Sequence, residues 1–253
     1  MIIDTPTVSD IPALRSLWSE AFGDGEQFLD DFFSSAFAAQ RARCVKINGS
    51  VCAALYWFDC SLYGERIAYV YAVATAQSHR NMGLCSRLMS DTHSHLGSLG
   101  YKGALLVPGS AELFSFYERL GYKLCSSVSE FSCTPGEYAA RLRRADAEEY
   151  AHLRRALLPD GGVIQENENI RFLKTQAELY VGDGFVFAAR RSKNTLYVTE
   201  LIGKRESAPS ILRALDCELG YFRTIGTEKP FAMYLPLCDQ APPAPRYFGL
   251  AFD

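Results

Sequence analysis

The chain has 253 residues, of which 48% are apolar and 22% are charged, and its formal net charge is −3. This composition is typical of a globular protein with one large domain or two small ones. The small negative charge argues against nucleic-acid binding driven by an overall positive field. No apolar run reaches the length that crosses a bilayer, and residues 1–5 carry neither the basic segment nor the apolar core of a signal peptide. We therefore expect a cytoplasmic protein without a membrane partner.

Two helices and three strands are predicted for the first 75 residues. Asp10 is a suitable N-cap for the first helix, and Pro12 lies in its first turn. Apolar side chains gather on one side of the second helix, and the turns Asn48-Gly49 and Tyr63-Gly64 separate alternating apolar segments. The expected helices cover residues 10–22 and 27–33, and the expected strands cover 44–47, 51–59 and 65–75.

A loop that carries Arg80 and Gly83 follows the third strand and opens onto a predicted helix. The helix is indicated by apolar residues at helical spacing, namely Leu84, Leu88, Thr92, Leu96 and Leu99. The start of a helix offers unpaired N–H groups and the positive end of the macrodipole, so it is suited to bind an anion. Gly83 lets a phosphate approach the backbone, and Arg80 can add a charge-assisted contact. The pattern predicts a diphosphate site, although many strand–helix junctions with an Arg and a Gly bind nothing.

The following residues predict a strand, a helix and a closing pair of strands. Residues 103–107 form a short apolar run, residues 110–122 predict a helix that ends at Gly121, and residues 123–133 predict the closing strands. The element order is then α, α, β, β, β, loop, α, β, α, β. This order indicates an α/β fold in which helices flank a mixed β-sheet.

Two motifs within these elements resemble the GNAT N-acetyltransferases. The pattern Arg80-x-x-Gly83-x-Cys85, after a strand that ends at Thr75, is similar to the acyl-CoA loop of that family, Arg/Gln-x-x-Gly-x-Gly/Ala. Cys85 departs from the last position of the pattern, but cysteine is also small. The loop motif thus agrees with the diphosphate site that the local physical chemistry predicts.

The second motif is a polar residue after a strand, followed by a Tyr four residues before a Gly-aromatic pair. Ser110, Tyr117, Gly121 and Tyr122 occupy these positions, and Ser110 stands where the family commonly has Asn. The two motifs occur in the family's order with a strand between them. Together the resemblance covers roughly residues 3–133.

The resemblance implies acetyl transfer from acetyl-CoA, as cosubstrate, to an amine by direct attack in a ternary complex. It implies that Tyr117 is the general acid that protonates the CoA sulfur, since a phenol with a pKa of ~10 is protonated at neutral pH. The alternative for Tyr117 is packing with Phe114 and Leu120. The backbone N–H of Val73 is the implied donor to the oxyanion. The implied acetyl-CoA-binding residues are Ala72, Val73, Ala74, Arg80, Asn81, Met82, Gly83, Leu84, Cys85 and Ser110.

The general base and the acceptor are not identified by the sequence. The candidates for the base are Glu20, Asp30, Asp31 and Glu65, or a chain of water molecules. An acidic cluster in the second helical region, which comprises Asp24, Glu26, Asp30 and Asp31, would attract a cationic amine. Five aromatic residues either pack in the core or line the acceptor site beside this acidic cluster as an aromatic wall: Trp18, Phe32, Phe33, Tyr56 and Trp57. Tyr69 and Tyr71 share a strand face and either contact substrate or pack within the sheet.

The residues after 133 predict a second unit. Thr134, Pro135 and Glu137 form a helix-start pattern, which indicates a helix to about residue 158. A helix over 170–180, a hairpin over 185–202, a helix over 207–219, a strand over 230–235 and a last strand over 246–253 are predicted next. Hairpin, helix and strand repeat the order around the first loop, so we expect a GNAT domain at 1–133 and a smaller, degenerate α+β GNAT-like unit at 134–253. An unrelated α+β extension is the alternative.

The eight cysteines and four histidines form no metal-binding pattern, so we expect free thiols and no metal. The predicted function is an acetyl-CoA-dependent N-acetyltransferase that acts on a small-molecule amine. The alternatives are a protein-lysine or N-terminal acetyltransferase, and an acyl-CoA-binding sensor without turnover. The acceptor, the acyl length and the oligomeric state are not predicted.

Overall fold

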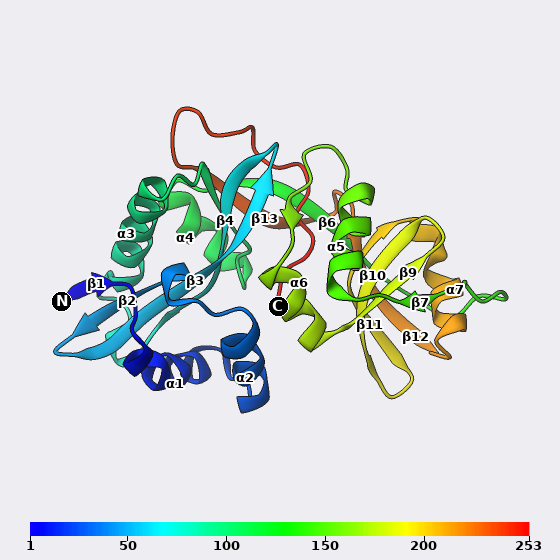
Figure 1. Ribbon diagram of the computed structural model, residues 1–253, viewed down its shortest axis with the longest axis horizontal. Coiled ribbons are helices and arrows are strands. Elements are labelled where there is room, and N and C mark those ends of the chain that lie inside the picture. The colour runs from blue at the N-terminus through cyan, green and yellow to red at the C-terminus, as the bar shows by residue number, and fades with distance from the viewer. Residues whose placement is uncertain (253) are drawn as a thin grey trace. The chain divides into compact units, whose positions relative to one another are not determined.

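Packing divides the chain into two units in the computed structural model, which describes residues 1–252 (Figure 1). Unit 1 comprises Met1–Lys123 and Met233–Pro243, and unit 2 comprises Leu124–Ala232 and the residues from Ala244 on. No helix in the described part of the chain is long and apolar enough to cross a bilayer. The domain division predicted at residue 133 stays a prediction.

Unit 1 is built on a mixed sheet with the strand order β1-β2-β3-β4-β5-β13. In this sheet β4 and β5 run parallel, whereas the pairs β1–β2, β2–β3, β3–β4 and β5–β13 run antiparallel. The strands are β1 (Ile2–Asp4), β2 (Ala42–Ile47), β3 (Ser50–Leu62), β4 (Glu65–Thr75), β5 (Gly103–Leu106) and the last part of β13 (Lys229–Pro236). The helices are α1 (Ile11–Phe22), α2 (Glu26–Ser35), α3 (Leu84–Ser98) and α4 (Ala111–Arg119).

Helices cover both faces of this sheet because side chains alternate along β3 and β4. On one face, Trp57 of β3 joins the hydrophobic core that contains Leu88 of α3. On the other face, Tyr56 and Tyr71 pack against Trp18 of α1, with ring centroids 5.1 and 5.6 Å apart. Figure 1 accordingly shows α1 and α3 on opposite sides of β3.

Unit 2 carries strands in the order β7-β9-β10-β11-β12-β6. The strands are β6 (Lys123–Cys133), β7 (Arg143–Arg144), β9 (Glu178–Gly182), β10 (Phe185–Ser192), β11 (Thr195–Gly203) and β12 (Leu219–Ile225), and the short β8 covers Ile164–Gln165. The helices are α5 (Ala147–Leu157), α6 (Glu168–Gln176) and α7 (Ala208–Ala214).

The two units repeat one order of elements. In each unit this order starts from a short edge strand, which two helices and then three antiparallel strands follow. A helix comes next, and the strand after it runs parallel to the last of the three antiparallel strands. The parallel pair is β4 and β5 in unit 1, and β11 and β12 in unit 2. The mixed sheet flanked by helices, which the sequence predicts, is confirmed.

The helix predicted from Thr134 is wrong. Residues 134–142 contain no helix, and α5 begins at Ala147 with Asp146 as N-cap, whose carboxylate accepts the N–H of Glu149 at 2.8 Å. The N–H groups of Gly136 and Ala140 donate instead to backbone carbonyls at positions 209 and 210. Backbone hydrogen bonds to α7 therefore replace those that a local helix would make.

Other predicted elements of unit 2 also need correction. Residues 123–133 form one strand and not two, the helix predicted over 207–219 ends at Ala214 and is followed by β12, and α6 ends at Gln176 before β9. Residues 246–252 are not a strand, apart from an isolated bridge at Tyr247, and Asp253 lies outside the described residues. The Tyr247 hydroxyl donates to Glu200 at 2.9 Å, and Gln165 donates to the carbonyl of Leu250 at 2.9 Å. Side-chain hydrogen bonds in the core thus hold the tail in place of a sheet ladder.

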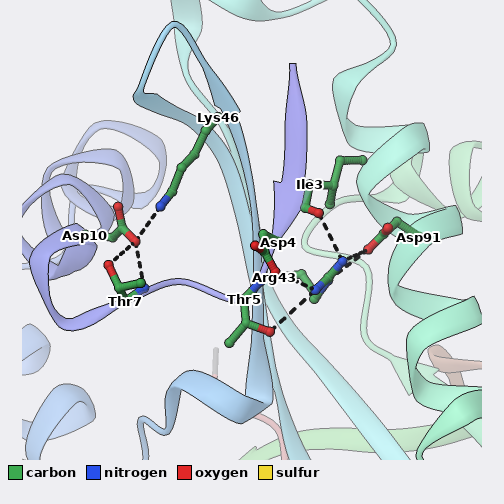
Figure 2. Close-up of polar contacts among 8 residues, drawn as sticks. All are labelled: Ile3, Asp4, Thr5, Thr7, Asp10, Arg43, Lys46 and Asp91. Atoms are coloured by element: carbon green, nitrogen blue, oxygen red, sulfur yellow. Dashed lines mark hydrogen bonds and ion pairs between the residues drawn. The ribbon is translucent and has the colours of Figure 1, made fainter.

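A network around Arg43 attaches α3 to the sheet of unit 1 (Figure 2). The guanidinium of Arg43 is mostly buried and donates twice to Asp91 of α3, at 2.8 and 2.6 Å. It also donates to the carbonyl of Ile3 at 3.2 Å and to Thr5 at 3.4 Å. One side chain of β2 therefore joins β1, the segment after it and the middle of α3.

We predict that Asp91→Asn lowers the free energy of unfolding by about 1–3 kcal/mol, because a buried guanidinium loses its charged acceptor. Urea unfolding followed by circular dichroism measures the change. Asp30→Asn is the matched control, since Asp30 pairs with Arg15 at an exposed site where such pairs contribute about 0–1 kcal/mol. Equal effects of the two substitutions would contradict the role assigned to Arg43.

Candidate functional site

The parallel pair β4 and β5 separates partway along unit 1. The register pairs Ile67 with Gly103 and ends at Tyr69 with Leu105, although β4 continues to Thr75. Backbone N–H and C=O groups of β4 beyond Tyr69 therefore have no ladder with β5 on that side, and we call this unpaired stretch the opening. Such groups need partners, and an extended ligand arm can supply them.

A β-bulge lies in β4 at this opening. Ala54 pairs with Ala74 and Tyr56 pairs with Tyr71, so Ala72 and Val73 together oppose one residue of β3. Ala72 has a φ of 49°, a left-handed conformation that costs a non-glycine residue about 1 kcal/mol or more. A bulge changes the direction of the backbone groups near it. The strand segment implied to bind the pantetheine thus has an irregular backbone.

The loop after β4 ends in an uncapped helix N-terminus. Asn81 and Gly83 both have positive φ, of 62° and 73°, and Gly83 is the N-cap of α3 without a side-chain hydrogen bond to the helix. A Cβ at Gly83 would meet no atom within 4 Å, so there is open space beside the backbone. The first N–H groups of α3 are therefore accessible to an anion.

Two side chains hold this loop. The Nε of Arg80 donates to the carbonyl of Thr75 at 3.2 Å, and the carboxylate of Glu20 accepts the N–H of Gln77 at 2.5 Å. Glu20 lies on α1, 57 positions before Gln77, so no local sequence pattern could reveal this contact. Glu20, proposed from sequence as a candidate base, thus has a positioning contact in the structure.

Tyr117 and Cys85 come together below the loop. Tyr117 is buried in the core of unit 1, and the partly buried Cys85 packs against that core. Burial, and next the proximity of Cys85, raise the pKa of the Tyr117 hydroxyl above its ordinary value. Burial also raises the pKa of Cys85 to about 11. Both groups therefore stay protonated at neutral pH.

The Gly121-Tyr122 pair ends α4 and fixes Tyr117. Gly121 has a φ of 93°, and the N–H of Tyr122 donates to the carbonyl of Tyr117 at 3.1 Å. The Tyr122 ring lies 5.9 Å from the Tyr117 ring, and its hydroxyl forms a 2.8 Å hydrogen bond with His93 of α3. The motif residues thus attach the end of α4 to α3, which also carries the loop.

Ser110 is the N-cap of α4 and is exposed, four positions after the end of β5. A hydrogen bond from Ser110, and next a backbone hydrogen bond, lower the pKa of Glu112. The Ser110 hydroxyl is therefore directed toward a carboxylate of its own helix. Its contact with CoA stays a prediction.

The carboxylates expected near the acceptor have partners. Arg15 contacts Glu26 at 2.5 Å and Asp30 at 2.8 Å, and the Trp18 indole donates to Asp24 at 2.8 Å. Asp31, another candidate base, accepts from Gln27 at 3.0 Å. Glu65 begins β4 at the end remote from the bulge, about 23 Å away by strand rise.

The proposed aromatic wall is largely core. Trp18, Phe32 and Tyr56 are at most 3% exposed and pack together on the α1 face of the sheet. Trp57 does not belong to this group, because it points to the opposite face and donates to Tyr101. Tyr71 is partly exposed and directly precedes the bulge.

Unit 2 lacks these features in the described chain. Only a short turn joins β11 to α7, where unit 1 has its loop. Three residues separate the end of β12 from the start of β13, without a counterpart of α4. No group of three or more His, Cys, Asp and Glu side chains among residues 1–252 is arranged to hold a metal ion. The candidate site therefore belongs to unit 1 alone.

Residues 3–125 match the family model of the acetyltransferase (GNAT) domain. This part of the chain is therefore a GNAT domain. The resemblance carried by the loop and Tyr117 motifs is thereby confirmed. No curated protein matches the sequence.

Solved GNAT structures share the fold over nearly the whole chain. A GCN5-related N-acetyltransferase from Anabaena variabilis has a TM-score of 0.75 at 12% identity, over 94% of this chain and 73% of that one. One from Kribbella flavida has a TM-score of 0.70 at 17% identity, over 92% and 70%. A tandem GNAT protein from the clavulanic acid biosynthesis pathway has a TM-score of 0.57 at 10% identity, over 94% and 100%. These similarities show the GNAT-like fold, while the roles of individual site residues stay predictions.

We predict that Cys85 is not a covalent acyl carrier. With a pKa of about 11, roughly 10⁻³ of the Cys85 thiol is ionised at pH 8. Iodoacetamide should therefore alkylate the exposed Cys238 at least about tenfold faster than Cys85. Peptide mass spectrometry measures both rates, and an acetyl adduct on Cys85 after incubation with acetyl-CoA would contradict the prediction.

Proposed function

We propose that this protein is an N-acetyltransferase that transfers the acetyl group of acetyl-CoA to a small-molecule amine. The observation that carries the proposal is the opening between β4 and β5. The strand on one side of it, β4, leads to the uncapped start of α3, and the strand on the other side, β5, leads to α4. The GNAT domain matched over residues 3–125 supports acyl transfer in general.

In this proposal the diphosphate of CoA binds the N–H groups at the start of α3. Gly83 leaves the space, the loop from Arg80 to Cys85 surrounds it, and the guanidinium of Arg80 adds charge. The pantetheine arm then takes the place of a strand beside β4, where it bonds to the backbone of Ala72, Val73 and Ala74. Because the pairing of β4 with β5 ends at Tyr69 and Leu105, no ladder hydrogen bond of β5 has to break for this arm to bind.

The proposed reaction is direct attack on the thioester. A neutral amine nitrogen forms a bond to the carbonyl carbon, and the carbonyl oxygen becomes an oxyanion that accepts the N–H of Val73. The C–S bond then breaks, and the sulfur takes the hydroxyl proton of Tyr117. Since the candidate carboxylates are engaged elsewhere or remote, the proposal assigns the amine proton to water.

The buried position of Tyr117 suits an acid and not a base. Its raised pKa keeps the phenol protonated through neutral and mildly alkaline pH, so the proton is present when the thiolate leaves. Burial also makes the phenol a weaker acid, and the same low-dielectric surroundings make a CoA thiolate more basic than in water, so the two effects oppose each other in the transfer of the proton to sulfur. Bulk water then restores the tyrosine proton after product release.

We predict that Tyr117→Phe lowers kcat by about 10²–10⁴ and leaves the affinity for acetyl-CoA within about threefold, since it removes only the proton donor. A thiol-release assay over a panel of polyamines and aminoglycoside-like amines measures turnover. Tyr122→Phe is the matched control, because it removes a buried hydroxyl in the same cluster and should lower stability more than kcat.

Two outcomes would overturn parts of this proposal. Wild-type turnover in Tyr117→Phe at saturating substrate would remove Tyr117 from the role of acid. Acetyl-CoA binding without thiol release for any small amine or lysine peptide would favour the sensor over the enzyme.

A further inference from the structure

A short turn leads from β4 into residues 80–85, the proposed diphosphate loop. This turn is a single 3-10 turn over Gln77–His79. The residue between β4 and the turn is Ala76, whose N–H donates to the carbonyl of Cys52 in β3 at 2.9 Å. Because the diphosphate loop begins directly after His79, the contacts that hold the turn also determine where the loop starts.

His79 attaches the end of the turn to the same residue of β3. Its Nε2 lies 3.6 Å from the Sγ of Cys52, and its Nδ1 lies 2.8 Å from the hydroxyl of Ser78. In either neutral tautomer one ring nitrogen donates and the other accepts, and both Ser78 and Cys52 can serve in either role. Both ring nitrogens are thus engaged within the protein, so His79 is placed to act on the loop and not on the donor substrate itself.

The Cys52 thiol is a buried anchor for this imidazole. Its neighbours Val51 and Ala53 pair with adjacent residues of β2, so Cys52 is the extra residue of a β-bulge. The thiol also lies 3.3 Å from the carbonyl of Ser50, which accepts the thiol proton when the imidazole does not. Cys52 is only 2% exposed. The imidazole is therefore held by a packed residue of the sheet and not by a surface side chain.

Glu20 of α1 holds the start of the turn. Its carboxylate accepts the N–H of Gln77 at 2.5 Å, and a charged acceptor forms a stronger hydrogen bond than a neutral one. The turn is therefore held from two elements of unit 1, from β3 through Ala76 and His79 and from α1 through Gln77. Contacts on two sides fix the direction of the N–H groups in the diphosphate loop before any ligand binds.

We propose that His79 and Glu20 are positioning residues that make this site selective for thioester donors that carry a diphosphate. This selectivity rests on the proposed function, in which the diphosphate binds the N–H groups at the start of α3. A loop that is held in its bound conformation loses less conformational freedom when a ligand binds, and only a ligand that contacts the loop gains from this. Acetyl-pantetheine has the same thioester and arm as acetyl-CoA but no diphosphate. Its binding is therefore independent of both side chains.

Calorimetry of the full-length protein with acetyl-CoA and with acetyl-pantetheine tests this role. His79→Ala and Glu20→Ala should each bind acetyl-CoA about five- to twentyfold more weakly than wild type does, and acetyl-pantetheine within about twofold of wild type. Cys52→Ser should stay within about twofold for both ligands, because its hydroxyl can pair with the imidazole, whereas Cys52→Ala should behave like His79→Ala. His95→Ala is the matched control, because His95 is also partly buried but lies in the last turn of α3.

Hydrogen exchange of the ligand-free protein gives a second measurement that does not depend on binding. Peptides that cover residues 76–84 should exchange at least about fivefold faster in His79→Ala and Glu20→Ala than in wild type, while peptides of α4 stay unchanged. Unchanged exchange over residues 76–84, or equal loss of affinity for the two ligands, would overturn the positioning role.

The positioning role and acetyl transfer fail in different ways. Wild-type affinity of both variants for acetyl-CoA would overturn the positioning role and leave the proposed function intact. Absence of acetyl-CoA binding by the wild-type protein would overturn the proposed function, and the positioning role with it.

Discussion

The separation of β4 from β5 after Tyr69 is the constraint on which unit 1 depends. A parallel pair that stayed closed would leave no backbone groups for a ligand arm and no space at the start of α3. The bulge at Ala72 and Val73 lies in the separated segment, and the loop that follows it begins α3. Arg43 of β2 donates to Asp91 in the middle of α3 and to the carbonyl of Ile3 in β1 (Figure 2). These contacts fix α3 on the sheet, and with it the start of the helix.

The local parts of this site could be predicted from the sequence. The hairpin turns at Asn48-Gly49 and Tyr63-Gly64, the loop around Gly83 and the helix that ends at Gly121 each carry their own signal in adjacent residues. Gly121 has positive φ, as is common just after a helix, and Gly83 has positive φ at the N-cap of α3. These positions depend on backbone conformation more than on tertiary packing.

The non-local parts could not be predicted in this way. The length of β4–β5 pairing is a property of register, and the contacts of Glu20 with Gln77 and of Arg43 with Asp91 join residues 57 and 48 positions apart. The start pattern at Thr134 failed for the same reason, because the backbone there bonds to α7. In the tail, the alternating pattern of apolar residues is explained by burial around Glu200 and not by a strand.

The two units share an order of elements but not a site. Unit 2 keeps the parallel pair β11 and β12, yet it has no long loop before α7 and no helix after β12. Unit 1 also uses residues 233–236, which pair with β5, so a fragment that ends at residue 133 would lack one strand of its sheet.

Calorimetric titration of the full-length protein with acetyl-CoA tests the central claim most directly. The account predicts saturable binding with one acetyl-CoA per chain, because within residues 1–252 only unit 1 combines an opened strand pair with a long loop that leads to an uncapped helix start. Absence of binding for both CoA and acetyl-CoA, or a stoichiometry of two per chain, would contradict it.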